Sequence, residues 1–229
     1  MPAWITHLAT AEKLMEDIHI QDKNSFLFGN IMPDILNNYI VKQTHLHINY
    51  EVSHFAILQM INHRNFALPG TEKFLWEYHK NIDNPVILGF YTHLLTDYFW
   101  NTITYENFFF GHNNCITVKF SDGMQKDYTY DDAIHMKHRD FGKFSGYLKN
   151  MYSLQPIEYA EKLCILSNEV KETPLTREDI QKTIEVLKES LQNSTVKEDS
   201  SYFLFSEDSL MPYFEQSIEF IKKSIKDFT

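Results

Sequence analysis

The segment at residues 85–100 carries a histidine and an aspartate at a spacing that suits metal binding. In this segment, PVILGFYTHLLTDYFW, His93 and Asp97 are four residues apart, so on a helix they project from the same face. A buried imidazole and a buried carboxylate need partners, because an unpaired buried charge is strongly destabilising. A hydrogen bond between the two would satisfy both, so the interpretation depends on other polar residues at apolar positions.

Three further residues have side chains that can bind a metal ion and lie among apolar neighbours in the sequence. His7 shares a helical stripe with Trp4. Asp34 lies between a proline and an isoleucine, and His54 precedes a phenylalanine. Separately, each has a structural explanation: a core histidine, a helix-capping aspartate and an exposed histidine of a first helical turn. Taken together with the first pair, they supply the ligands of zinc, iron or manganese hydrolases. We therefore predict that one or two ions, Zn²⁺ with Mn²⁺ or Fe²⁺ as alternatives, are bound by His7, Asp34, His54, His93 and Asp97.

The motifs around these residues resemble those of the zinc-dependent phospholipase C family. The matching motifs are His7 in W-x-x-H, Asp34 in G-x-x-x-P-D, His54 in H-F, and His93 with Asp97 in G-x-x-x-H-L-x-x-D. They follow the family's order over roughly residues 1–105. That family, related in fold to the single-strand-specific P1/S1-type nucleases, is a compact helical bundle with a zinc cluster. The resemblance implies that His54, His93 and Asp97 bind one ion, with Asp34 as ligand or base, and that His7 and a bridging Asp97 bind a second.

Hydrolysis of a phosphoester bond is the activity that such a site predicts. Two ions within about 4 Å of each other hold a hydroxide at neutral pH and clamp a phosphoryl group. Asp97 would bridge the ions and Asp34 would orient or deprotonate the attacking water, so these two residues are the predicted catalytic pair. Thr92, Thr96 or tyrosines would fix the imidazole tautomers. A mononuclear hydrolase site is the alternative.

The chain also departs from the family's pattern. In secreted members the N-terminal tryptophan binds metal through its own amino group, whereas Trp4 here follows three residues without an export signal. The family's remaining zinc uses two more histidines and the glutamate of an H-x-x-x-E motif, and Arg139 occupies that glutamate's place. We expect an incomplete cluster. The weaker ligand candidates, of which the last two are the better, are His112, His135, His138 and Asp140.

An H-x-H pair in a polar loop is a further candidate for the same site. His45 and His47 lie in the segment KQTHLHINYE and could replace His54 as a ligand. A solvated loop is the simpler explanation for both.

Hydrophobic periodicity predicts an all-α bundle around the metal ligands. The segment at 85–100 is apolar nearly all round and should be the central helix, begun by Asn84 and Pro85. A β-hairpin with an Asp122-Gly123 turn is predicted at 115–130. An apolar stripe near the C-terminus should pack on the bundle. The other predicted helices, after a short segment at 25–29 and a turn at Pro33, are 3–18, 53–64, 71–80, 132–152, 157–170, 176–191 and 206–228.

Composition bounds the remaining possibilities. With 229 residues and 43% hydrophobic content, the chain can bury a large core, and we expect one helical metal-binding domain over residues 1–229. A net charge of −10 disfavours nucleic acid as a partner. No apolar run spans a membrane, and Cys115 and Cys164 are far apart, so a cytoplasmic protein is expected. The expected substrate is a small phosphoester or phospholipid-like molecule, and the expected state is a monomer or weak homodimer.

Two alternative functions remain open at this point. A phosphohydrolase of the HD type is also helical and metal-dependent, but it requires an adjacent His-Asp dipeptide. None of the eleven histidines is followed by aspartate. A helical binding or scaffold domain with structural histidines is the alternative outside enzymes.

Overall fold

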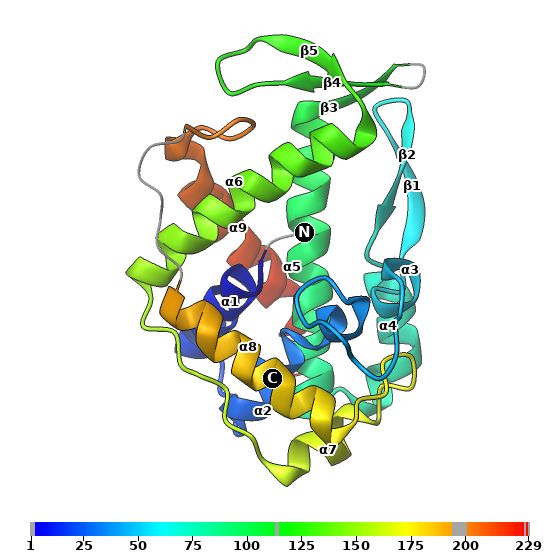
Figure 1. The fold of residues 1–229 in the computed structure, drawn as a ribbon, viewed down its shortest axis with the longest axis vertical. Coiled ribbons are helices and arrows are strands. Elements are labelled where there is room, and N and C mark those ends of the chain that lie inside the picture. The colour runs from blue at the N-terminus through cyan, green and yellow to red at the C-terminus, as the bar shows by residue number, and fades with distance from the viewer. Residues whose placement is uncertain (1–2, 113–114, 194–200, 227, 229) are drawn as a thin grey trace.

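The computed structural model describes residues 3–112, 115–193, 201–226 and 228, and this part of the chain is mostly helical. Figure 1 shows the helices gathered around one long central helix, with two small sheets at one end of the molecule. The helices are α1 (Trp4–Asp17), α2 (Lys23–Gly29), η1 (Met32–Asn37), α3 (Tyr50–Ser53), α4 (Thr71–Tyr78), η2 (His79–Asn81), α5 (Pro85–Phe108), α6 (Tyr130–Met151), α7 (Glu161–Ser167), α8 (Arg177–Asn193) and α9 (Glu207–Ile225). The strands are β1 (Ile57–Ile61), β2 (Arg64–Leu68), β3 (Phe109–His112), β4 (Cys115–Lys119) and β5 (Gln125–Tyr128).

Helix α5 is the central helix, as its composition predicts. Its first turn is capped by Asn84, whose side chain accepts a hydrogen bond from the Val86 amide at 2.9 Å. Pro85 occupies the first helical position, where a missing N–H costs nothing. Helices α1, α2, α4, α7 and α9 all pack on α5, so nearly every side of its first three turns is buried. The helix runs to residue 108, two turns beyond the predicted end.

Two glycines bring α2 unusually close to α5. A Cβ atom on Gly29 would lie 2.2 Å from the Val86 carbonyl oxygen, and one on Gly89 would lie 2.2 Å from the Phe26 carbonyl oxygen. Any larger residue at either position would therefore push the two helices apart. This contact matters for the site, because Asn30 directly follows one glycine and His93 lies one turn after the other.

The predicted helix at 53–64 is wrong, because this segment forms the β-hairpin of β1 and β2. Ser53 ends the short helix α3, and Phe55 then adopts a positive φ of 53°. The two-residue turn at Asn62 and His63 has φ values of 45° and 63°, the left-handed pair that a tight hairpin needs. The Asn62 side chain also donates to the carbonyls of Tyr105, Glu106 and Phe109, which ties the turn to the end of α5.

The predicted hairpin at 115–130 is confirmed as β4 and β5, with Gly123 at a φ of 85° in the turn. A third strand, β3, pairs with β4 and was not expected. The predicted all-α class therefore holds only in its coarser form, as a mostly helical fold with two small antiparallel sheets.

The remaining helices follow the predicted order with shifted ends. The predicted helix at 157–170 is shorter and spans only α7, whereas α8 begins at the predicted capping box. There the Thr176 hydroxyl donates to Asp179 at 2.6 Å and accepts from the Asp179 amide at 3.2 Å. The C-terminal apolar stripe on α9 faces α1 and α5. Its buried members are Leu210, Phe214, Ile218, Ile221 and Ile225.

Candidate metal centre

Five side chains from four segments meet beside α5. His7 comes from α1, Asp34 from η1, and His54 from the residue that ends α3, while His93 and Asp97 face them from α5. Asp34 is 1% exposed and the other four are completely buried. The structure thus brings together all five residues that the sequence singled out.

The nitrogen and oxygen atoms of these residues lie within ion-pair distance of one another. Nε2 of His7 is 3.3 Å from Oδ1 of Asp97, and Nε2 of His54 is 3.5 Å from Oδ2 of Asp97. Nε2 of His54 is also 3.6 Å from Oδ1 of Asp34. Two overlapping sets, His7–Asp34–His93 and His54–His93–Asp97, place one ligand atom of each residue within 4.8 Å of the others. These buried groups could hold a metal ion.

The packing of α2 on α5 fixes the orientation of one imidazole. Nδ1 of His93 lies 2.8 Å from the carbonyl oxygen of Asn30. A carbonyl oxygen only accepts, so Nδ1 carries the proton and donates it there. In the neutral ring, Nε2 then presents a lone pair toward Asp97 and His54. A backbone carbonyl that holds the other ring nitrogen is the usual support of a metal-binding histidine.

His54 is held on both sides. Its Nδ1 lies 2.8 Å from the Ser53 hydroxyl, and its ring stacks on that of Tyr50 with centroids 4.2 Å apart. Its Nε2 lies 3.2 Å from Nε2 of His93. Without a metal, the Ser53 hydroxyl can donate to Nδ1 of His54, and Nε2–H of His54 can donate to His93. A purely structural arrangement therefore satisfies these two histidines.

That structural arrangement leaves other polar atoms of the cluster without partners. Neither oxygen of Asp97 and neither ring nitrogen of His7 has a hydrogen-bond partner in the described part of the structure. The His7 ring stacks on His93 with centroids 3.8 Å apart, which holds it beside the carboxylate without hydrogen-bond geometry. A buried polar group without a partner is a rare and costly feature. A cation among these atoms would satisfy both oxygens of Asp97 and the Nε2 atom of His7.

The protonation states suit a metal. Burial raises the pKa of the Asp34 carboxyl to about 7, and the neighbouring Asp97 carboxylate adds to the rise. Burial also acts to raise the pKa of Asp97, but interactions with His54 and His7 hold it well below its usual range. Burial lowers the pKa of His54, and it lowers that of His93 further with the help of His7. At neutral pH, Asp97 is therefore ionised, and both lowered histidines are neutral ligands.

Among the weaker candidates with described side chains, none belongs to either ligand set. His135 is exposed on α6. His112 ends β3, and its side chain lies outside the described part of the structure. His138 lines a cavity of about 420 Å³ that Asp34 also borders, but it belongs to neither ligand set. Burial lowers the pKa of His138 to about 3, so its imidazole is neutral at physiological pH.

Asp140, one of the weaker ligand candidates, has hydrogen-bond partners outside the cluster. Its carboxylate accepts hydrogen bonds from the backbone N–H groups of Phe203, Leu204 and Phe205 at 2.9, 2.7 and 3.3 Å. These donors occupy the carboxylate and fasten the segment that precedes α9 to α6. Asp140 is thus a structural residue.

The H-x-H pair lies in the loop between η1 and α3, as expected. The ring of His45 forms a short contact with the Asp179 carboxylate, and its amide donates to the same group at 3.1 Å. Nδ1 of His47 lies 3.3 Å from the Asn38 side chain. Both histidines are exposed and have partners of their own, so neither replaces His54.

Three residues near the cluster escaped sequence reasoning. Asn30 and Tyr50 contact two of the histidines, and nothing in the sequence marks either one. The third is Lys137, which is 2% exposed on α6 and donates to Asn101 Oδ1 at 2.8 Å and to the Tyr105 hydroxyl at 3.1 Å. Its place on the apolar stripe of α6, four residues after Ala133 and four before Phe141, was the available signal.

Comparisons with protein-family models, curated proteins and solved structures give no match.

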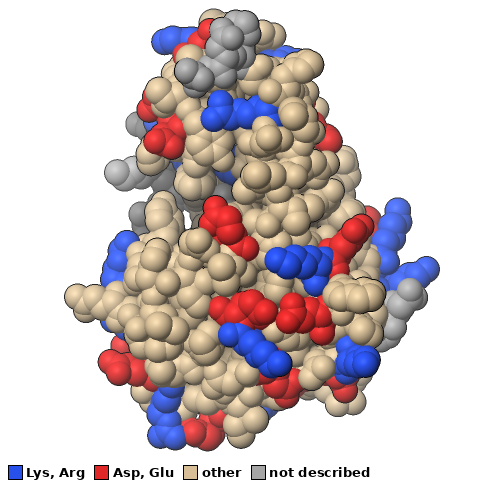
Figure 2. Space-filling view, turned by 90° about the vertical axis from the view of Figure 1, so that its right-hand side faces the viewer, with Lys and Arg blue, Asp and Glu red and all other residues tan. Residues whose placement is uncertain are grey.

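Among the described residues, no helix combines the length and apolar character needed to cross a membrane. On the face that carries β1 and β2, Lys and Arg side chains are interspersed with Asp and Glu among mostly uncharged residues (Figure 2). The described residues of that face form no extended basic surface of the kind that binds a phosphate backbone. The candidate function therefore depends on the geometry of the cluster.

Proposed function

We propose that the protein is a metal-dependent hydrolase of phosphoester bonds and that zinc is its preferred ion. The observation that carries the proposal is the buried Asp97 carboxylate, whose two oxygens lack hydrogen-bond partners among the described residues while three histidine nitrogens lie within 3.8 Å of them. A set of three imidazoles and two carboxylates suits Zn²⁺, and Mn²⁺ or Fe²⁺ also accept it. The ligand set would be His7, His54, His93 and Asp97, with Asp34 as ligand or base.

One ion or two ions can be accommodated by this donor set. His93 belongs to both sets of possible ligands, but its single free nitrogen serves one ion only. The two oxygens of Asp97 point to different histidines, Oδ1 to His7 and Oδ2 to His54 and His93. Asp97 is therefore the residue that would bridge two ions. A bound divalent ion supplies Lewis acidity toward a phosphoryl oxygen.

Asp34 has the features of the proton acceptor. The Asn37 side chain donates to its Oδ1 at 3.1 Å and so orients the carboxyl group. In the metal-free site burial raises the pKa of Asp34 to about 7, and a bound cation would lower it, so that the carboxylate is ionised and available to accept a proton at neutral pH. Asp34 also borders the cavity, so a water molecule in that cavity can reach it. We assign to Asp34 the removal of a proton from the attacking water, and to Asp97 the binding of metal.

A hydrolysis screen tests the proposal. Protein whose zinc or manganese content has been measured is offered a nitrophenyl phosphomonoester, a phosphodiester, a short-chain phospholipid and an oligonucleotide. We expect hydrolysis of at least one, loss of activity on chelation, and recovery when metal is returned. The Asp34→Asn variant should lose roughly 100-fold or more of the rate. His19→Ala, which changes an exposed histidine away from the cluster, is the matched control and should retain full activity.

Inactivity of the metal-loaded protein toward all four classes would contradict the proposal. It would favour the alternative of a helical binding domain, in which the contact between His54 and His93 is structural.

A further inference from the structure

A cavity beside Asp34 is lined by residues of η1 and α3, the elements that position Asp34 and His54, and by residues of α6, which carries none of the five cluster residues. It measures about 420 Å³, within the range of small-molecule sites. Asp34 belongs to its wall, and so does Tyr50, whose ring stacks on the imidazole of His54. A molecule in this cavity would therefore contact the one cluster residue that is not completely closed off. The lining residues are Ala3, Asp34, Asn37, Tyr39, Ile40, Tyr50, His138 and Gly142.

The wall chemistry favours an apolar, flat group. The described lining residues include no lysine or arginine. Apart from Asp34, Asn37 is the one described lining residue with a polar, non-aromatic side chain. One N–H of the Asn37 amide and one lone pair of its oxygen are already used, because the side chain donates to Asp34 and accepts from the Tyr39 amide at 2.8 Å. The exposed surface of the lining is mostly apolar, so a sugar would leave part of its hydroxyl groups unpaired against this wall. An aromatic ring would instead pack against the rings of Tyr39, Tyr50 and His138.

Gly142 opens the wall on the side of α6. It lies inside a helix, where glycine is less favourable than alanine. A Cβ atom there would meet no heavy atom within 4 Å, so no close neighbour requires a glycine. His138 lies one turn earlier on the same face of α6 and also lines the cavity. The missing side chain therefore widens the cavity and has no packing role of its own.

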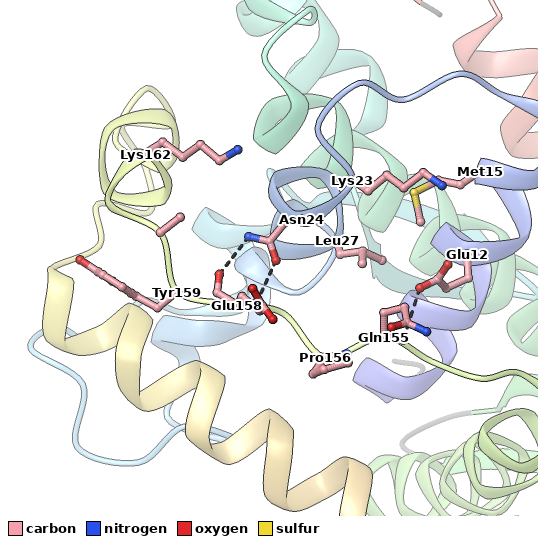
Figure 3. Close-up of a pocket in the computed structure, with 11 residues that line it drawn as sticks. Glu12, Met15, Lys23, Asn24, Leu27, Gln155, Pro156, Glu158, Tyr159 and Lys162 are labelled. Carbon is pink, nitrogen blue, oxygen red and sulfur yellow. Dashed lines mark hydrogen bonds between the residues drawn. The ribbon is translucent and has the colours of Figure 1, made fainter.

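A second hollow of similar size shows that volume alone does not mark a site. This hollow, drawn in Figure 3, measures about 450 Å³ and lies between α1, α2 and the segment that precedes α7. Its wall includes charged side chains of both signs, Glu12, Lys23 and Lys162 among them. The side chain of Asn24 fastens one wall by hydrogen bonds to the Glu158 backbone at 2.9 and 2.8 Å. None of the five cluster residues lines this hollow.

We infer that the cavity bordered by Asp34 and Gly142 binds the alcohol part of the substrate and that this part is a compact aromatic group. The inference rests on the proposed function, since it names the substrate class of the same site. In this inference Gly142 determines the width of the cavity and so helps to determine which substrates fit.

Binding of two phosphonates, which resist hydrolysis, tests the inference. The dissociation constants of phenylphosphonate and methylphosphonate are measured by calorimetry on zinc-loaded and on chelated protein. We expect phenylphosphonate to bind the zinc-loaded protein at least tenfold more tightly than methylphosphonate. Gly142→Leu should remove this preference without changing zinc content or the affinity for methylphosphonate. The matched control is Ala160→Leu, which adds volume to the hollow of Figure 3 and should change neither constant.

The outcomes separate this inference from the proposed function. Equal affinity for the two phosphonates would overturn the inference that the cavity binds an aromatic group. A preference for phenylphosphonate that survives in Gly142→Leu would overturn it too. A dispersed short-chain phospholipid that displaces phenylphosphonate and binds more tightly than it does would overturn the inference as well. The protein could also prefer phenylphosphonate, lose this preference in Gly142→Leu, and yet hydrolyse no phosphoester. That result would support the aromatic-group cavity and contradict the proposed hydrolase function.

Discussion

Two buried carboxylates on helices α5 and α6 have opposite surroundings. Asp140 accepts hydrogen bonds from three successive backbone N–H groups at residues 203–205. Asp97 has no hydrogen-bond donor on either oxygen among the described residues, and three imidazoles surround it. Both residues are at most 1% exposed, so burial does not distinguish them. The difference shows that the donors supplied by the rest of the chain decide whether a buried carboxylate is structural or is available to a cation.

Metal addition should give the largest effect and should act only through the Asp97 site. An ion that binds the folded state alone raises the free energy of unfolding by about 4 kcal/mol at a thousand times its dissociation constant. We expect zinc to raise the denaturation midpoint of chelated protein by a corresponding amount in urea unfolding. The same titration on Asp97→Asn should give little change, because the bridging carboxylate is lost. If zinc, manganese and iron all leave the denaturation midpoint unchanged, Asp97 does not bind a metal ion and does not differ from Asp140 in this respect.

Asp140→Ala should destabilise the fold and leave metal binding intact. The substitution removes the acceptor of three backbone N–H groups, and each buried donor left unpaired costs about 1–3 kcal/mol. We expect the free energy of unfolding to fall by roughly 3 kcal/mol or more in urea, with the zinc content per folded molecule unchanged. Loss of bound zinc from a variant that still folds would return Asp140 to the list of ligands.

Lys137 extends the comparison to a buried cation that donates hydrogen bonds to two neutral oxygens. Burial lowers its pKa from 10.5 to about 8. Between these values the unfolded chain binds more protons than the folded one, so this lysine makes the free energy of unfolding rise as pH rises. Relative to Lys137→Met, the wild-type protein should gain about 1.5 kcal/mol between pH 8 and pH 9.5. Parallel stability profiles for the two proteins over this window would show that the lysine is not desolvated as described.

Local sequence signals predicted the features that depend on neighbouring residues. Asn84 with Pro85 marked the start of α5, and Thr176 with Asp179 marked that of α8. The five cluster residues were found because polar types stood at apolar positions of a regular pattern. Their convergence in space agrees with that interpretation, whereas the bound ion and the chemistry remain predictions.

The features that were missed depend on partners distant in the sequence. The spacing of apolar residues at 55–61 fits a helix as well as a strand. The hairpin forms because Asn62 anchors its turn to the end of α5, more than 40 residues away. Asp140 stayed among the weaker ligand candidates because its donors lie more than 60 residues later, where no local pattern marks them. The role of Asn30 likewise depends on a backbone carbonyl that two glycines bring to His93.

The most direct test of the central claim is elemental analysis combined with anomalous scattering at the zinc edge on crystals of the purified protein. We expect one or two peaks enclosed by His7, Asp34, His54, His93 and Asp97, with matching zinc content in solution. We also expect that Asp97→Asn lowers that content sharply, whereas His19→Ala does not. Full metal content in Asp97→Asn, or the absence of any peak among these five residues in zinc-soaked crystals, would contradict the account.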